Sequence, residues 1–262
     1  MTNIQVVFKT FCLCKIDDAV GISGTIPSEI GLLSGLEHLI IKNNKNLIGT
    51  IPNEIGNLVN CYQLGIYNNN VEGNIPGEII SLSKLIYLNF SDNKLSGRVP
   101  SNIGLLTKLR KIILDDNDLT GHILPIQYRQ MTNLEFLSLS GNSFGGTLPP
   151  AVKFMKSLQY LYLDDNNFSG RIPPELSNLK SLKSLGLGGN NFHLDLPIEL
   201  GSLSQLEFFS LHNNKLSGQI DNDLIRQLGN IKHLYFHENN FNGTIPRSFF
   251  TLKELGKCVE SV

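Results

Sequence analysis

Two carboxylates, Asp115 and Asp164, stand at equivalent places in repeated segments of this chain, and a pair of carboxylates can be catalytic. Paired carboxylates supply the acid and the base or nucleophile of glycoside hydrolysis. That reaction needs a pocket that excludes water and raises the pKa of one carboxyl group, whereas we expect these residues on an open sheet. No nucleotide-binding loop, Ser-His-Asp spacing or Cys-His signature accompanies them. The sequence therefore predicts a protein that is not an enzyme and that uses no cofactor.

His212 and His237 also occupy equivalent places, in neighbouring segments, and Glu238 follows the second histidine. Two adjacent imidazoles could share a metal ion, but a zinc site needs at least one further well-placed ligand. Gly188, at the same place in the preceding segment, has no side chain to offer. We therefore predict no metal site and count both histidines among the residues that could contact a ligand.

A repeated segment of 24 or 25 residues positions these side chains. Its apolar residues fall at positions one, four and six, as in Leu158, Leu161 and Leu163, and positions four and six alternate like a short strand with one buried face. The nine copies begin at Leu36, Cys61, Leu85, Leu109, Leu134, Leu158, Leu182, Leu206 and Ile231. Such a fixed period is typical of a solenoid, because one unit cannot bury its apolar faces alone and a stack of units can.

Position nine of the repeat is asparagine in every copy. These residues are Asn44, Asn69, Asn93, Asn117, Asn142, Asn166, Asn190, Asn214 and Asn239. A buried amide donates and accepts hydrogen bonds at once, so stacked asparagines could satisfy the backbone groups that are freed where each strand turns away. We therefore predict a structural ladder of buried asparagines.

The second half of the unit carries an apolar residue, a glycine and an Ile-Pro pair, as in Phe168, Gly170, Ile172 and Pro173. The units resemble leucine-rich repeats of the plant type, LxxLxLxxNxLxGxIPxxLGxLxx, which occur in the ectodomains of receptor-like kinases and receptor-like proteins and in polygalacturonase inhibitors. The resemblance implies an α/β-type repeat solenoid. This is a right-handed horseshoe with a parallel β-sheet on its concave face and 3₁₀ or irregular segments on its convex face.

The same resemblance implies a non-catalytic module that binds a protein or peptide ligand on the concave face, as a receptor does. Two alternatives stay open, an intracellular scaffold and a secreted inhibitor of a hydrolase such as a polygalacturonase. The repeats cover residues 22–254, as a partial repeat followed by nine repeats. Residues 1–21 are expected to be a degenerate N-terminal cap or a mis-started segment, and residues 255–262 a remnant of a C-terminal cap.

The location of the protein stays open at this point. The resemblance implies an extracellular or cell-surface protein, whereas the first residues are a poor signal peptide because Lys9 interrupts a short apolar run. An intracellular location follows if the N-terminus is complete. Asn167 and Asn242 begin Asn-x-Ser/Thr patterns and are candidate glycosylation sites. A third pattern begins at Asn89, where a glycan would obstruct the concave strand.

The net charge and the length of the apolar runs argue against nucleic-acid binding and against a membrane span. A formal net charge of -1 does not supply the basic face that nucleic acids require. No apolar run reaches the length of about 18 residues that a membrane span needs.

Equal positions of successive repeats should form columns on the concave face, with strands about 4.8 Å apart. Aromatic residues gather at positions three and five, which face solvent, and exposed aromatic side chains are common anchors of binding surfaces. The candidate ligand-binding residues are Tyr87, Asp115, Phe136, Tyr160, Tyr162, Asp164, Phe208, His212, Tyr235 and His237.

The acidic residues near these aromatics allow two interpretations. They are Asp92, Asp115, Asp116, Asp164 and Asp165. They could face a basic residue of the ligand, or they could only favour the turn that precedes each asparagine. In the seventh repeat, Ser184, Gly186 and Gly188 are small, so the sequence predicts a hollow between two aromatic groups.

Overall fold

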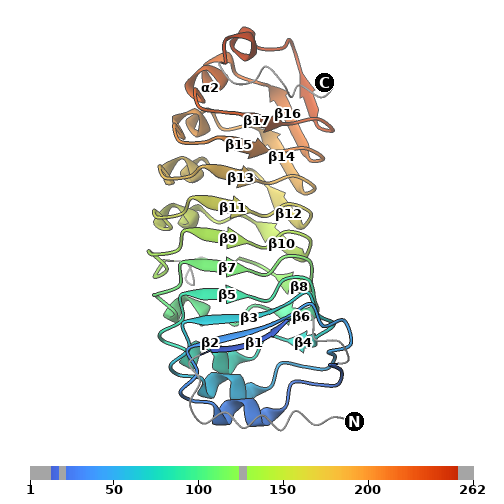
Figure 1. Cartoon of the computed structure of the whole chain (residues 1–262). Helices are drawn as coiled ribbons and strands as arrows, with labels where there is room; N and C mark the ends of the chain where they lie inside the picture. The colour runs from blue at the N-terminus through green and yellow to red at the C-terminus, as the bar shows by residue number, and fades with distance from the viewer. Residues whose placement is uncertain (1–12, 18–21, 124–128, 253–262) are drawn as a thin grey trace.

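The computed structural model describes residues 13–17, 22–123 and 129–252. In these residues the repeats stack into one elongated solenoid, with the first and the last described repeats at its two ends (Figure 1). Most repeats contribute one strand to each of two parallel sheets and one short helix. The predicted repeat solenoid is therefore confirmed.

The first sheet has ten parallel strands in chain order; we call it the concave sheet and its solvent side the concave face. Its strands are β1 (Leu13–Asp17), β2 (His38–Lys42), β3 (Gln63–Tyr67), β5 (Tyr87–Asn89), β7 (Lys111–Ile113), β9 (Phe136–Ser138), β11 (Tyr160–Tyr162), β13 (Ser184–Gly186), β15 (Phe208–Ser210) and β17 (His233–Tyr235). The register pairs equal positions, so that Tyr160 lies opposite Phe136 on one side and Ser184 on the other. The predicted columns therefore run along the whole face.

Strand β1 lies within the N-terminal segment that the repeat pattern did not cover. Cys14 pairs with Leu39 and is buried, and Ile16 pairs with Ile41. These two residues thus take positions four and six of an additional unit. The pattern did not reveal the strand because cysteine replaces leucine and because the sequence has no asparagine five residues after Cys14.

A second parallel sheet, of eight strands, was not predicted. Its strands are β4 (Glu72–Asn74), β6 (Lys94–Arg98), β8 (Asp118–Gly121), β10 (Ser143–Thr147), β12 (Asn167–Gly170), β14 (Asn191–Asp195), β16 (Lys215–Gln219) and β18 (Asn240–Asn242). Neighbouring strands are offset by two positions of the repeat, since Ser96 pairs with Asp118. Most of these strands contain a glycine such as Gly97, with a φ of 73°, and glycine is depleted from strands. The sequence pattern therefore gave no strand signal here.

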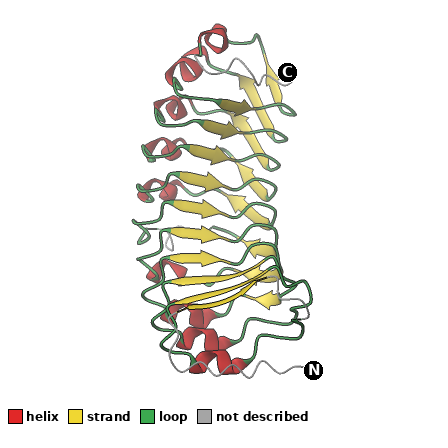
Figure 2. Ribbon diagram, in the orientation of Figure 1, coloured by secondary structure: helices red, strands yellow, loops and turns green. Residues whose placement is uncertain are grey.

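Short helices lie along the edge of the stack opposite the second sheet (Figure 2). The 3₁₀ helices are η1 (Ser28–Leu32), η2 (Asn53–Asn57), η3 (Gly77–Ser81), η4 (Ile103–Leu105), η5 (Pro150–Phe154), η6 (Pro174–Asn178), η7 (Ile198–Ser202) and η8 (Arg247–Thr251). One unit instead forms an α-helix, α2 (Asn222–Gln227), where Asp221 replaces the usual proline. Its carboxylate accepts hydrogen bonds from the N–H groups of Asp223 and Leu224, at 2.6 and 3.1 Å, and such a cap stabilises the first helical turn.

The asparagines of position nine connect successive repeats. In the case of Asn166, Nδ2 donates to the carbonyl oxygen of Leu139 in the preceding repeat at 2.9 Å, and Oδ1 accepts from the N–H group of Phe144 at 2.9 Å. Equivalent bonds occur at each such asparagine from Asn93 to Asn239. Each amide thus satisfies buried backbone groups of two repeats.

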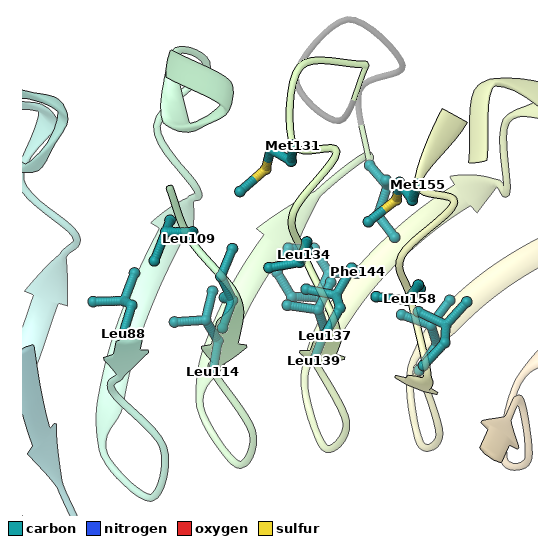
Figure 3. Close-up of a cluster of buried hydrophobic side chains, with 14 of the residues drawn as sticks. Leu88, Leu109, Leu114, Met131, Leu134, Leu137, Leu139, Phe144, Met155 and Leu158 are labelled. Atoms are coloured by element: carbon teal, nitrogen blue, oxygen red, sulfur yellow. The ribbon is translucent and has the colours of Figure 1, made fainter. Parts of the chain in front are cut away.

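A single hydrophobic core runs the length of the stack. Leucines of positions one and four, such as Leu134 and Leu137, fill it beneath the concave sheet (Figure 3). Beneath the second sheet, the ring of Phe168 stacks between those of Phe144 and Phe192, with centroid distances of 6.4 and 6.3 Å. This packing fixes the spacing of the strands, and therefore the spacing of the side chains on the concave face.

Candidate functional site

Five aromatic side chains form a continuous strip on the concave face, which we call the aromatic strip. Its members are Phe136, Tyr160, Tyr162, Phe208 and Tyr235, all partly exposed. The ring centroid of Phe136 lies 5.5 Å from that of Tyr160 and 5.7 Å from that of Tyr162. The centroid of Phe208 lies 6.5 Å from that of Tyr162 and 5.7 Å from that of Tyr235. Direct ring contacts therefore join repeats five, six, eight and nine.

Strand alternation places these rings on the solvent side. Leu161, between Tyr160 and Tyr162, is buried in the core, and so is Phe209, which follows Phe208. Successive side chains of a strand point to opposite faces of the sheet. The order of apolar and aromatic residues within each strand is thus sufficient to expose the aromatic strip.

A lysine joins the aromatic strip to Tyr87. The ammonium nitrogen of Lys111 lies 4.2 Å from the ring centroid of Phe136 and 5.9 Å from that of Tyr87, a distance at which an aromatic face attracts a cation. We did not predict a site role for Lys111. The contact could have been inferred from the sequence, because Lys111 stands between Tyr87 and Phe136 in the column of third positions.

The hollow predicted in repeat seven is filled by side chains of the neighbouring repeats. A Cβ atom at Gly186 would collide with the carboxylate of Asp164, and one at Gly188 would collide with the imidazole of His212. Ser184 is only 4% exposed although it stands on the solvent side of β13. The prediction of an open hollow was wrong because it considered only the side chains of repeat seven itself.

Asp115 and Asp164 bind the strand of the following repeat. Oδ1 of Asp115 accepts hydrogen bonds from Oγ of Ser138 at 2.5 Å and from the N–H group of Ser140 at 2.8 Å. Oδ1 of Asp164 accepts from the N–H group of Gly188 at 2.9 Å. Burial is the largest influence on both carboxyl groups, and it raises the pKa of each. Both aspartates therefore hold adjacent repeats together, and a ligand could reach them only through the remaining oxygen.

The aspartates of position eight serve the turn that precedes each asparagine. Asp92, Asp116 and Asp165 have φ values of 55°, 52° and 52°, in the left-handed region that aspartate and asparagine tolerate better than most residues. Their place is otherwise taken by asparagine, glycine or glutamate. The turn interpretation therefore accounts for these three residues without a ligand.

The two histidines of position seven stack on one another. The ring centroids of His212 and His237 lie 5.2 Å apart with an interplanar angle of 20°. Nδ1 of His212 lies 2.8 Å from Oγ of Ser210, and the ring of Tyr235 meets that of His237 edge-on at 6.5 Å. No group of three or more metal-ligating side chains occurs in the described part of the chain. The histidine pair thus widens the aromatic strip at its C-terminal end.

Both candidate glycosylation sites lie on the second sheet. Asn167 begins β12 and Asn242 ends β18, and both are exposed. Asn89, by contrast, is 6% exposed on the concave sheet, where its Oδ1 accepts a hydrogen bond from the N–H group of Ser91. A glycan on Asn167 or Asn242 would therefore leave the concave face free. Among the described helices, none is both long enough and apolar enough to span a bilayer.

Comparison with known families identifies the repeat. Residues 132–192 match a family model described as leucine rich repeat, and residues 84–106 and 230–252 match a second model of the same description. No curated protein matches the chain.

Solved structures resemble the chain over most of its length. The plant peptide hormone receptor RGFR1 in complex with RGF2 is 30% identical with a TM-score of 0.84, and the match covers 89% of this chain and 37% of that one. The Arabidopsis receptor kinase HAESA, in complex with the peptide hormone IDA and the co-receptor SERK1, is 32% identical with a TM-score of 0.83, over 89% and 39% of the two chains. A plant ice-binding protein is 27% identical with a TM-score of 0.79, over 90% and 74%. The chain thus spans less than two fifths of the length of the two receptors.

Proposed function

Because the chain is a leucine-rich repeat protein with repeats of the plant type, we propose that it is a non-catalytic recognition module that binds a peptide or protein segment along its concave face. The aromatic strip is the observation that carries this proposal. Partly exposed rings in mutual contact offer a large apolar area, and they lose little conformational freedom when a ligand covers them.

The dimensions of the face suit an extended peptide. Tyr87 and Tyr235 stand on strands separated by six steps of the concave sheet, which is about 29 Å at about 4.8 Å a step. An extended chain advances about 3.3 Å per residue. A segment of about nine residues that crosses the strands would therefore reach from Tyr87 to Tyr235 and cover the whole aromatic strip on the way.

Two of the similar structures support this proposal. RGFR1 and HAESA are receptors in complex with peptide hormones, and the present chain aligns with about 89% of its own length to a part of each. The similarity to an ice-binding protein does not favour a second function. A flat and regular threonine or asparagine array would be expected for ice, whereas the third-position column changes from His38 through Lys111 to Phe208.

Selection of peptides on the immobilised protein tests the proposal. A library of displayed peptides is panned on the protein, and the enriched peptides are measured against the double variant Tyr160→Ala/Tyr162→Ala. Removing two anchors should weaken binding by at least about tenfold, since one hot-spot side chain contributes more than about 1 kcal/mol.

The variant Tyr62→Ala is the matched control. Tyr62 is a partly exposed tyrosine next to the concave sheet, but its ring contacts His38 and Lys84 instead of the aromatic strip. Thermal unfolding of both variants should stay close to that of the original protein. Equal binding of the enriched peptides to the double variant and to the control would refute the proposal.

A further inference from the structure

A buried hydroxyl group without a hydrogen bond lies beneath the aromatic strip. Ser184 is 4% exposed, and its Oγ has no partner among the described residues. The register places Ser184 between Tyr160 and Phe208, and the next residue, Leu185, points into the core. The hydroxyl group therefore points toward the concave face. Because an unsatisfied buried hydroxyl group is destabilising, a ligand atom that reached it would gain a hydrogen bond.

A carboxylate lies beside this hydroxyl group. Oδ1 of Asp164 accepts a hydrogen bond from the N–H group of Gly188. Oδ2 lies against Gly186, which comes two residues after Ser184. None of the ion pairs found in the described residues includes Asp164. His212, whose ring lies against Gly188, lowers the pKa of the Asp164 carboxyl less than burial raises it. Because burial of an incompletely compensated carboxylate is costly, this place favours a further positively charged group.

Aromatic residues flank repeat seven on both sides. Tyr162 pairs in register with Gly186, and Phe208 pairs with Ser184. Their ring centroids lie 6.5 Å apart, so the two rings meet across repeat seven. The N-terminal end of the strip shows how such rings hold a cation, because the ammonium group of Lys111 lies over Phe136.

We propose that this place, which we call the repeat-seven subsite, receives one basic side chain of the bound peptide. The rings of Tyr162 and Phe208 separate, and the cationic group pairs with Oδ2 of Asp164 and donates a hydrogen bond to Oγ of Ser184. The ring faces then flank the cation. An ammonium or guanidinium group has only donors, and the subsite offers it two acceptors and two π faces. This inference rests on the proposed function and specifies one residue of the ligand.

Titration with single amino-acid derivatives tests the subsite directly. The probe is Nα-acetyl-lysine amide, and the control probe is Nα-acetyl-norleucine amide, which has the same aliphatic chain without the ammonium group. Backbone amide shifts of Gly186 and Gly188 are followed by NMR of the whole chain. The lysine derivative should produce saturable shifts, and the norleucine derivative should bind at least about tenfold more weakly, as expected when a charge pair is lost.

Two variants separate the role of the subsite from a role in folding. Asp164→Asn keeps an oxygen that can accept from the N–H group of Gly188, and it should weaken binding of the lysine derivative by about tenfold or more. Ser184→Ala removes a hydroxyl group that has no partner, and it should weaken binding about threefold while the Tm stays equal or rises. Asp118→Asn, at an exposed position of the second sheet, is the matched control and should change nothing.

Equal affinity for the two derivatives would overturn the subsite, and so would unchanged affinity of both variants. The panning experiment reports independently on the proposed function. Enriched peptides that need Tyr160 and Tyr162 but carry no basic residue would leave the proposed function standing and refute the subsite. Failure to enrich any peptide, with the lysine derivative still bound at Gly188, would instead refute peptide recognition.

Discussion

Replacement of one ladder asparagine should leave a single backbone group without a partner, and the structure gives the size of the effect. Asn166→Ala removes the acceptor of the N–H group of Phe144. The carbonyl oxygens to which Asn166 donates keep other donors. The carbonyl oxygen of Leu139 still accepts from Nδ2 of Asn142, and that of Leu163 from Nδ2 of Asn190. The carbonyl oxygen of Asp164 still accepts from the N–H group of Gly141. One buried N–H group is therefore orphaned, which corresponds to a loss of about 1–3 kcal/mol in the free energy of unfolding.

The variant Asn44→Ala is the control for this prediction. Oδ1 of Asn44 has no partner among the described residues, and its Nδ2 donates only to the carbonyl oxygen of Lys42. The same substitution in the same column should therefore cost less than about 1 kcal/mol. Because a solenoid unfolds in parts, amide hydrogen exchange is the suitable assay, with Phe144 as the reporter for Asn166. Equal losses at Asn44 and Asn166 would show that the amide contributes by packing and would refute the hydrogen-bond argument.

Two further predictions concern single side chains. Burial raises the pKa of Asp164 above its ordinary value of 3.8, so the folded state binds the proton of this carboxyl group more tightly than the unfolded state does. The contribution of Asp164 to the free energy of unfolding therefore falls as the pH rises from about 3.8 through the raised pKa. Asp164→Asn should remove that fall, which urea unfolding at a series of pH values measures; an unchanged difference between acidic and neutral pH would contradict the assignment. Leu194 has a φ of 69° and is 53% exposed, at a place where other repeats have glycine. Leu194→Gly should relieve about 1–2 kcal/mol of backbone strain against an entropic cost of about 0.4–1 kcal/mol, so the Tm should rise, and a lower Tm would show that the exposed side chain matters more than the backbone.

The repeat pattern was sufficient to predict the solenoid, the concave sheet and its columns, because positions four, six and nine each have one physical task. It was not sufficient for β1, where Cys14 replaces leucine and no asparagine follows at position nine. It also missed the second sheet, whose strands contain glycines such as Gly97 and Gly218. In the second sheet the backbone pairs with its neighbours without the side-chain alternation that identifies a strand.

The candidate site was predicted less completely, because contacts between repeats decide it. The columns identified the members of the aromatic strip but not the contact of Lys111 with Phe136. They also gave no sign that Ser184 would be buried, since its own repeat has only small residues there. Ser184 pairs in register with Tyr160 and Phe208 of the two flanking repeats, and the rings of Tyr162 and Phe208 meet across repeat seven.

The aspartates of position seven show that residues on the concave face depend on the next repeat. Asp164 requires Gly186, because a Cβ at Gly186 would occupy the place of its carboxylate, and it accepts a hydrogen bond from the backbone N–H group of Gly188. Asp115 likewise binds two small residues, Ser138 and Ser140, at the same two positions of the repeat that follows. In both pairs, the aspartate at position seven therefore lies against a small residue at position five of the next unit. It follows that the charge offered to a ligand here is set by pairs of adjacent repeats, so that exchange of repeat five or of repeat seven would break the contact with the aspartate of the repeat before it.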